Sequence, residues 1–316
     1  MKNFKVKKYI LYLLLIVFLP VGITLLFTFI TSEVYIGMGS LCVSDHLMGR
    51  KILLETKGLY KDVDVEEYVA GVMAGTVPAD YDIETLKVQA VLIRTNVLKE
   101  MEELKTSDGA DLSYQYLTME ERKEIWGQRN YEKNEKKMEQ AVSSTANMVL
   151  YFEEELIMAL YHEVSIGKTA SAKEILDQDI SYLQSVESSQ DVEAKHYMNI
   201  VLYSKKEMQE ILGTDTDNGG DDIHISIENS TENGFVKEVK INDTVYSGEE
   251  VMNMFQLPSL NYYVEEVDNG IRFVCLGTGN CMGVSLYGAN YMAQNGATME
   301  DIIAYYYKDV SLKKYN

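Results

Sequence analysis

The spacing of apolar residues changes along the chain and divides it into segments. Residues 9–30 are almost wholly apolar, whereas residues 32–50 carry no such run. At about 1.5 Å per residue, a helix over residues 9–30 spans the roughly 30 Å hydrocarbon core of a bilayer. The pattern therefore predicts a cytoplasmic tip with a transmembrane anchor at 1–31, a juxtamembrane stalk at 32–50 and an extracytoplasmic domain at 51–316.

Two consecutive segments of this domain repeat their apolar residues at helical spacing. The first covers residues 65–73 and the second covers residues 86–104. Pro78 disfavours the helical conformation for the residue before it, so we expect the first helix to end near Ala74 or Gly75. Thr76 is then expected in an irregular loop between two packed helices.

The rest of the domain consists of shorter periodic runs separated by polar turns. A charge-dense segment at 105–131, with Trp126 as its main apolar anchor, is expected at the surface. Asn-Gly and Asp-Asn-Gly turns are typical of hairpins. Strands are expected near 51–55 and at 148–152, 156–161, 223–227, 235–241, 244–246, 262–267 and 271–276, with helices at 132–145, 283–295 and 298–307. The predicted fold class is α+β, mixed and mostly antiparallel, and its length allows two lobes around a groove.

The distribution of charge predicts the membrane topology and excludes a nucleic-acid-binding protein. Four lysines, at 2, 5, 7 and 8, precede the apolar run, so the positive-inside rule places the N-terminus in the cytoplasm and the domain outside the cell membrane. A cleaved signal peptide is the alternative, but no Ala-x-Ala site follows the long run. The chain has 29 basic and 49 acidic residues, which excludes nucleic-acid binding. Such an acidic surface would repel any anionic polymer, so recognition of one would have to rely on short-range hydrogen bonds and stacking.

Three ordered blocks of sequence carry a recognisable pattern. The first, Val65–Thr95, contains Glu-Glu-Tyr-Val, then Val-Pro, then Leu-Lys-Val-Gln-Ala-Val and Arg-Thr. The second is Tyr161–Thr169, which is YHEVSIGKT, and the third is Gly277–Ala289, which is GTGNCMGVSLYGA. Together these blocks resemble the stage II sporulation protein D / amidase-enhancer family of cell-wall proteins, and on them the chain is identified as a member.

The resemblance implies a chemistry and a set of partners. Members characterised as lytic transglycosylases cut peptidoglycan with one carboxyl group, which protonates the glycosidic oxygen and then accepts a proton from the muramic acid C6 hydroxyl to close an anhydro ring. The implied partners are glycan strands and other engulfment or amidase proteins, in sporulation or wall remodelling. No cofactor is implied.

The chain departs from the family pattern at the residues that matter most for this reaction. Thr76 stands at the position of the catalytic Glu. In the third block, Asn280 replaces a His, Cys281 a Gly and Leu286 a Gln. A threonine hydroxyl cannot supply the general acid catalysis that is worth about 10²–10⁴ in rate. We therefore expect a protein that binds glycan or engages partners without cutting, although its status as an enzyme stays open.

Two alternatives remain from the sequence. An active lytic transglycosylase could use a relocated carboxylate, for which Glu84 and Asp80 are the first choices. Asp82 and Glu163 are also close in sequence to the matched positions, but Asp82 is better explained as a helix cap, Glu84 as a first-turn acid, and Asp80 and Glu163 as solvated charges. The other alternative is a structural envelope protein without a glycan site.

The second and third blocks offer groups that suit sugar hydroxyls and acetamido groups. Each of these residues also has an ordinary explanation as a turn, cap or strand-end residue. The candidate substrate-binding residues are His162, Ser165, Gly167, Lys168, Thr169, Gly279, Asn280, Gly283, Ser285 and Tyr287.

Metal and disulfide signals are weak. Cys42, Cys275 and Cys281 are too few for a disulfide framework, so free thiols are favoured over a Cys275–Cys281 bridge. The Asp215-x-Asp217-x-x-x-Asp221 run is similar to a calcium loop but lacks the closing Glu. No metal site is predicted.

Overall fold

The computed structural model describes residues 50–56, 58–213, 223–268 and 270–315, which all belong to the unit Leu47–Asn316. The predicted membrane-spanning segment, most of the stalk and the Asp215–Asp221 run lie outside these residues. Within them, no helix has the length and apolar character needed to cross a bilayer. The membrane anchor and the three-part domain division therefore stay predictions.

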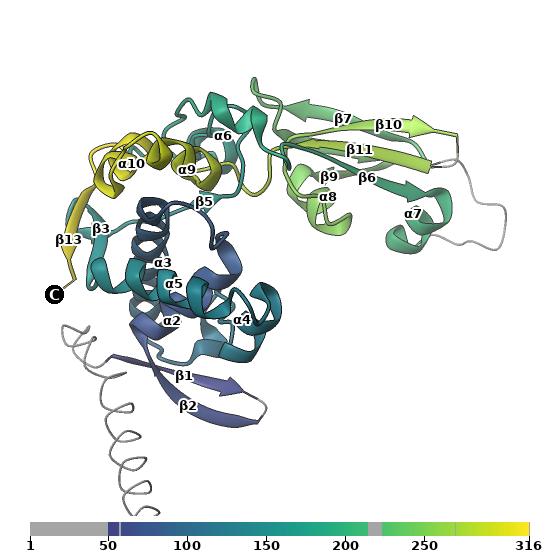
Figure 1. Cartoon of the computed structure of the whole chain (residues 1–316). Coiled ribbons are helices and arrows are strands. Elements are labelled where there is room, and N and C mark those ends of the chain that lie inside the picture. The colour runs from purple at the N-terminus through teal and green to yellow at the C-terminus, as the bar shows by residue number, and fades with distance from the viewer. Residues whose placement is uncertain (1–49, 57, 214–222, 269, 316) are drawn as a thin grey trace, which may run out of the picture. The chain divides into compact units, whose positions relative to one another are not determined.

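Helices and strands alternate irregularly along the chain (Figure 1). The helices are α2 (Val65–Thr76), α3 (Ile83–Leu104), α4 (Met119–Trp126), α5 (Tyr131–Ser144), α6 (Ala172–Leu176), α7 (Lys205–Leu212), α8 (Gly248–Met254), α9 (Leu286–Gln294) and α10 (Met299–Tyr306), with 3-10 turns at Gly109–Asp111 and Ser189–Glu193. The strands are β1 (Lys51–Thr56), β2 (Leu59–Asp64), β3 (Met148–Phe152), β4 (Glu155–Leu156), β5 (Tyr161–His162), β6 (Met198–Ser204), β7 (Ile225–Ser230), β8 (Val236–Ile241), β9 (Thr244–Ser247), β10 (Tyr262–Val267), β11 (Gly270–Leu276), β12 (Val284–Ser285) and β13 (Ser311–Lys314).

The strands form small sheets with the orders β1-β2, β13-β3-β4, β12-β5, β7-β8-β9 and β10-β11-β6. Each pair of named strands is antiparallel except the short parallel pair β5 and β12. The predicted α+β class with mostly antiparallel strands is therefore confirmed.

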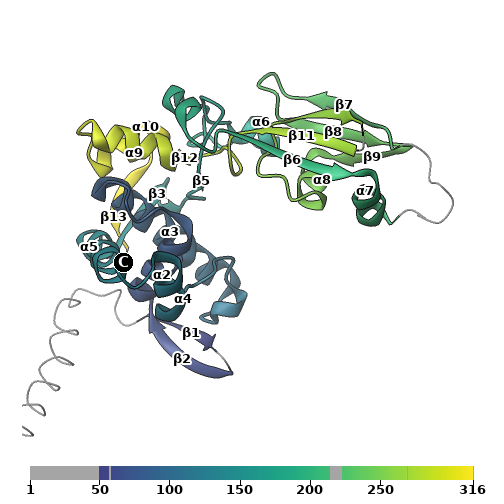
Figure 2. The same cartoon turned by 45° about the vertical axis from the view of Figure 1, so that its right-hand side comes forward.

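Helix α3 is the central element of the helical part and contacts α2, α5, α9, α10 and β3 (Figure 2). Leu86, Ala90 and Ile93 belong to the hydrophobic cluster shared with α2 and α5. Val88 and Leu92 project into a second cluster with α9 and α10. The predicted apolar stripe is thus correct, but α3 is buried on two sides, which extends its apolar surface beyond one stripe.

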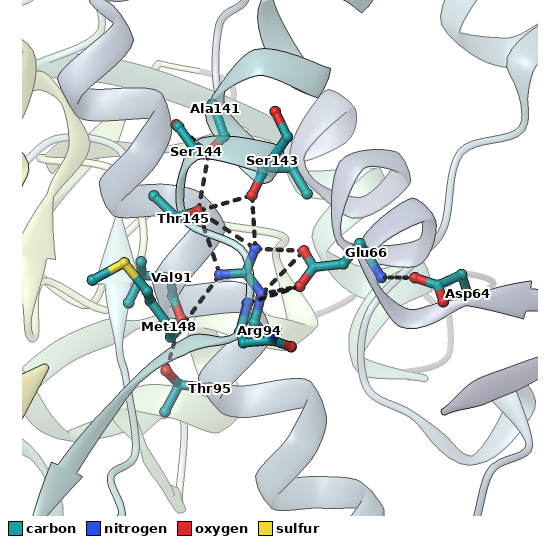
Figure 3. A network of polar contacts seen from close by, with 12 residues as sticks. Asp64, Glu66, Val91, Arg94, Thr95, Ala141, Ser143, Ser144, Thr145 and Met148 are labelled. Atoms are coloured by element: carbon teal, nitrogen blue, oxygen red, sulfur yellow. Dashed lines mark hydrogen bonds and ion pairs between the residues drawn. The ribbon is translucent and has the colours of Figure 1, made fainter. Parts of the chain in front are cut away.

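A buried ion pair joins α2 to α3. The Arg94 side chain is fully buried, and its Nε and Nη2 donate to both carboxylate oxygens of Glu66 at 2.6–3.1 Å (Figure 3). The guanidinium also donates to the Met148 and Val142 carbonyl oxygens and to Thr145 Oγ1. Arg94 therefore ties the start of α2 to α5 and β3.

Some boundaries differ from the prediction. Helix α2 continues to Thr76, because only Val77, directly before Pro78, takes the extended conformation, at φ −140° and ψ 137°. The helix expected at 283–295 begins at Leu286, since the residues before it form β12.

The polar segment 105–131 contains helix α4, which the prediction missed. A capping box between Thr118 and Glu121 starts this helix. Trp126 packs against the cluster around α2 and α3, as expected.

The sheets β7-β8-β9 and β10-β11-β6 share a separate hydrophobic cluster with helices α7 and α8. Phe255 and Phe273 stack on each other within this cluster. Cys275 lies in this cluster and is a free buried thiol, as is Cys281. The arrangement of two lobes around a groove stays a prediction.

Candidate functional site

Thr76 ends α2 with its hydroxyl already bonded. Its Oγ1 donates to the Val72 carbonyl oxygen at 3.1 Å and accepts from Gln89 Nε2 at the same distance. Burial raises the pKa of Tyr161, at the start of the second block, and the neighbouring Thr76 and Gln89 side chains partly oppose this rise. The position at which the resemblance implies a catalytic acid is therefore part of a neutral cluster of a hydroxyl, an amide and a phenol.

The turn after α2 brings acidic and aromatic groups near this cluster. Burial raises the pKa of Tyr81 to about 12, and the charges of Glu163 and Asp80 add to the effect. The Tyr287 backbone N–H donates to the Glu163 carbonyl oxygen at 3.1 Å, which ties the third block to the second. Glu163 and Asp80 are both exposed. The structure thus brings the first, second and third blocks to one place.

The other carboxylates near Thr76 serve as caps and ion pairs. Asp82 is the N-cap of α3, as expected, and accepts from the Glu84 backbone N–H at 2.9 Å. Glu84 pairs with Lys87 Nζ at 2.6 Å through one oxygen and accepts from the Met299 N–H, at the start of α10, through the other. Glu84 is therefore engaged by two partners, whereas Asp80 and Glu163 are solvated.

A buried aspartate that the sequence did not single out organises the second and third blocks. Asp191 is fully buried. Its Oδ2 accepts from the Ser165 backbone N–H at 2.7 Å and from Ser285 Oγ at 2.6 Å, while its Oδ1 accepts from Ser188 Oγ at 2.9 Å. Asp191 lies inside the 3-10 turn Ser189–Glu193, whose N-cap residue Ser188 makes no side-chain cap bond, so no local sequence signal marked it.

Four candidate binding residues are buried in this scaffold. His162, Ser165, Thr169 and Ser285 are at most 3% exposed. Thr169 Oγ1 accepts from the Val186 N–H, and Ser285 caps α9 by accepting from the Gly288 N–H. These side chains hold the loops in place, and a direct contact with a polymer would require them to be uncovered.

The glycines of the two loops allow close backbone approaches. At Gly283, with φ of +69°, an added Cβ would lie 1.9 Å from the Leu160 carbonyl oxygen, so a side chain is excluded there. Gly167 and Gly279 also have positive φ, at +97° and +101°. Lys168 and Tyr287 are half-buried, which leaves part of each side chain accessible from these loops.

The three departures in the third block each have a structural role. Asn280 Oδ1 accepts from the Met282 N–H at 2.9 Å and closes a turn. Cys281 has φ of +59°, a conformation that a glycine adopts without strain. Leu286 packs in the cluster with α2 and α3. Neither the Asn280 amide nor the Leu286 side chain can act as an acid or base, although the Asn280 amide nitrogen can still donate a hydrogen bond.

The burial of His162 predicts how the free energy of unfolding depends on pH. Its Nδ1 bonds the Met282 carbonyl oxygen at 2.9 Å, and burial lowers its pKa from 6.5 to about 4. Since the unfolded state binds more protons between these values, the free energy of unfolding should fall as pH falls from 6.5 to 4, by at most about 1.4 kcal/mol per pH unit from this group.

Urea unfolding at a series of pH values checks this prediction. A His162→Asn variant is the matched control, because an amide can keep the bond to Met282 and does not titrate. The difference in unfolding free energy between the two proteins should change across this window. A constant difference would show that folding does not lower the pKa of His162.

In the residues that the structure describes, no cluster of three or more His, Cys, Asp or Glu side chains could hold a metal ion. The calcium-like run lies outside those residues.

Fold and site together define an α+β protein whose three sequence blocks meet around the end of one helix. A family model described as "Stage II sporulation protein" matches residues 55–152. Stage II sporulation protein D of Bacillus subtilis (strain 168) is 31% identical over 262 residues, covering 80% of this chain and 76% of that protein. The Bacillus amyloliquefaciens protein of the same name is 30% identical over 262 residues, covering 80% of this chain and 75% of that protein.

The chain therefore belongs to the stage II sporulation protein D family. The resemblance predicted from the three blocks is confirmed. The relatives of the chain indicate a function related to sporulation.

Proposed function

We propose that this chain is an envelope protein of sporulation that binds the glycan strands of peptidoglycan and does not cut them. The observation that carries the proposal is the chemistry at Thr76. Its hydroxyl donates back to the helix and accepts from Gln89, and the neighbouring phenol of Tyr161 has a raised pKa. The Thr76 hydroxyl and the Gln89 amide do not ionise near neutral pH, and the raised pKa of Tyr161 makes its phenol a poor acid for a leaving glycosidic oxygen.

The proposed location is the cell membrane, with one N-terminal span and the described domain outside. The apolar run at 9–30 and the lysines before it support this topology. A tethered binder needs only modest affinity for the wall, because the anchor keeps it close to the glycan. Other engulfment or amidase proteins are the proposed protein partners.

The proposed contact surface lies beside Thr76 and consists of the accessible groups from the three blocks. Tyr81 and Tyr287 offer aromatic rings for sugar stacking, and Lys168 and Asn280 offer donors for hydroxyl and acetamido groups. The net charge of the chain is −20, so this surface has to bind through such short-range contacts.

Co-sedimentation with purified sacculi tests the proposal. The chain should sediment with denuded glycan, and a Tyr287→Ala variant should lose most of that binding. Tyr60→Ala is the matched control, because Tyr60 is 65% exposed on β2, is not part of any of the three blocks, and its removal should leave binding unchanged. Failure of the unaltered chain to bind either denuded or peptide-bearing sacculi would refute the proposed role.

An active lytic transglycosylase with a relocated carboxylate is the second candidate. Its supporting observation is that Asp80 and the second-block Glu163 are exposed and lie near Tyr81, whereas Glu84 is already engaged by Lys87 and Met299. Under this alternative the unaltered chain cleaves glycan, and one of Asp80→Asn, Glu84→Gln or Glu163→Gln abolishes cleavage.

A further inference from the structure

Strand β6 presents an apolar face to solvent. Met198, Ile200 and Leu202 alternate along the strand and are 56%, 60% and 62% exposed. The residues between them, such as Val201 and Tyr203, pack into the cluster beneath. A strand of an antiparallel sheet with one solvated face normally carries polar side chains on that face. The apolar residues on the solvated face of β6 therefore need an explanation.

The apolar face continues across the neighbouring strands. Ile200 lies opposite Val274 on β11, which in turn lies opposite Tyr263 on β10, and Met198 lies opposite Leu276. Tyr263 is 53% exposed. The only ion pair on this face joins Arg272 to Glu265, among the residues that the structure describes.

Strand β6 is also an edge strand. In the described part of the chain it pairs with β11 on one side and with no strand on the other (Figures 1 and 2). The Gly277 N–H donates to the Tyr197 carbonyl oxygen, so the backbone groups of odd-numbered residues point to β11. By alternation, the N–H and C=O groups of Met198, Ile200 and Leu202 point to the open edge.

The usual protections of an edge strand are missing from β6. Its sequence, MNIVLYS, has no charged residue, proline or glycine, and its pairing with β11 is regular over seven residues. The sheet β7-β8-β9 of the same chain does have such protections. Its edge strand β9 has only four residues, and the pairing register of β7 is irregular. Its outer face carries the polar residues Ser226, Glu238 and Lys240. Natural proteins protect their free edges in these ways, so an unprotected edge indicates that a partner strand covers it.

We propose that β6 is the pairing edge of a two-fold symmetric dimer, in which the β6 strands of two copies align antiparallel and join their sheets into one. A lipid surface could cover the apolar side chains but could not satisfy the backbone groups at the edge. The strand is self-complementary: about a two-fold axis at Ile200, Met198 of one copy lies opposite Leu202 of the other, and no charges meet. Two chains of net charge −20 repel elsewhere, so an uncharged edge is where they can approach.

Disulfide trapping in the full chain tests this dimer and does not depend on glycan binding. In a Cys42→Ser background, Ile200→Cys should form a disulfide-linked dimer under mild oxidation, because the two-fold axis brings this position opposite itself. The native Cys275 and Cys281 are buried, so they do not compete. Val245→Cys, at a position that is 58% exposed on β9, is the matched control and should stay monomeric.

Two further measurements sharpen the test. A Leu202→Lys substitution should abolish trapping at position 200, because it places a charge in the pairing edge while leaving the buried face of β6 intact. Trapping should increase with salt, since screening reduces the repulsion between acidic copies. If the Ile200→Cys chain crosslinks no more than the Val245→Cys chain, or if Leu202→Lys has no effect, the proposed dimer is wrong.

Discussion

A Thr76→Glu variant should release anhydromuropeptides from purified sacculi. Residue 76 stands where the sequence resemblance implies a catalytic acid, and a glutamate there would place a carboxyl group beside the Gln89 amide and the Tyr161 hydroxyl. Partial burial raises the pKa of a carboxyl group toward the working pH, which suits a general acid. The gain expected from one such group is about 10²–10⁴ in rate over the background.

Thr76→Gln is the matched control for this experiment. Glutamine has the size of glutamate and can form similar hydrogen bonds, but it has no ionisable proton. Product from the glutamate variant alone would show that the acid was the missing element. If both variants are inactive while binding is retained, then the changes at Asn280 and Leu286 also prevent cleavage, and the loss is broader than one residue.

An Arg94→Met variant should lose about 3–5 kcal/mol of the free energy of unfolding. The substitution removes the partner of the Glu66 carboxylate, which is 5% exposed and would keep a hydrogen bond from the Asn147 backbone N–H at 3.2 Å. It also removes the donors to two backbone carbonyl oxygens at the end of α5 and the start of β3. Chemical denaturation of the parent and the variant measures the loss.

The double variant Arg94→Met with Glu66→Leu separates the ion pair from packing. An apolar pair of similar volume removes the unpaired charge, so the double variant should be more stable than Arg94→Met alone. A Lys61→Met variant is a suitable control, because Lys61 pairs with Glu67 at the surface and its loss should change stability by less than about 1 kcal/mol. If Arg94→Met and Lys61→Met lower the free energy of unfolding by the same amount, the structural role assigned to Arg94 is wrong.

The helices around Thr76 could be predicted because their signals are local. The apolar spacing of α3, the Asp82 cap and the Thr298–Asp301 capping box all lie within a few residues of the elements that they specify. The strands of the C-terminal sheets alternate clearly, and β10 was predicted with its observed bounds. Local signals of this kind survive folding because tertiary contacts agree with them.

Other elements escaped prediction because their pattern follows tertiary contacts. Strand β6 has apolar residues on both faces and exposes one of these faces, whereas alternation of apolar and polar residues would mark the buried face. Its sequence therefore did not indicate which side is buried. Asp191 carries no motif of its own, and its importance comes from Ser165 and Ser285, which are distant in sequence. The burial of Ser165, Thr169 and Ser285 likewise depends on which loops meet, and this cannot be deduced from a single sequence.

The most direct test of the account is the incubation of the unaltered protein with purified sacculi, followed by analysis of the soluble muropeptides. The account predicts that the protein sediments with denuded glycan and releases no anhydromuropeptide above the buffer control. Accumulation of anhydromuropeptides with the unaltered protein would contradict it and show that a carboxylate other than one at position 76 performs the cleavage.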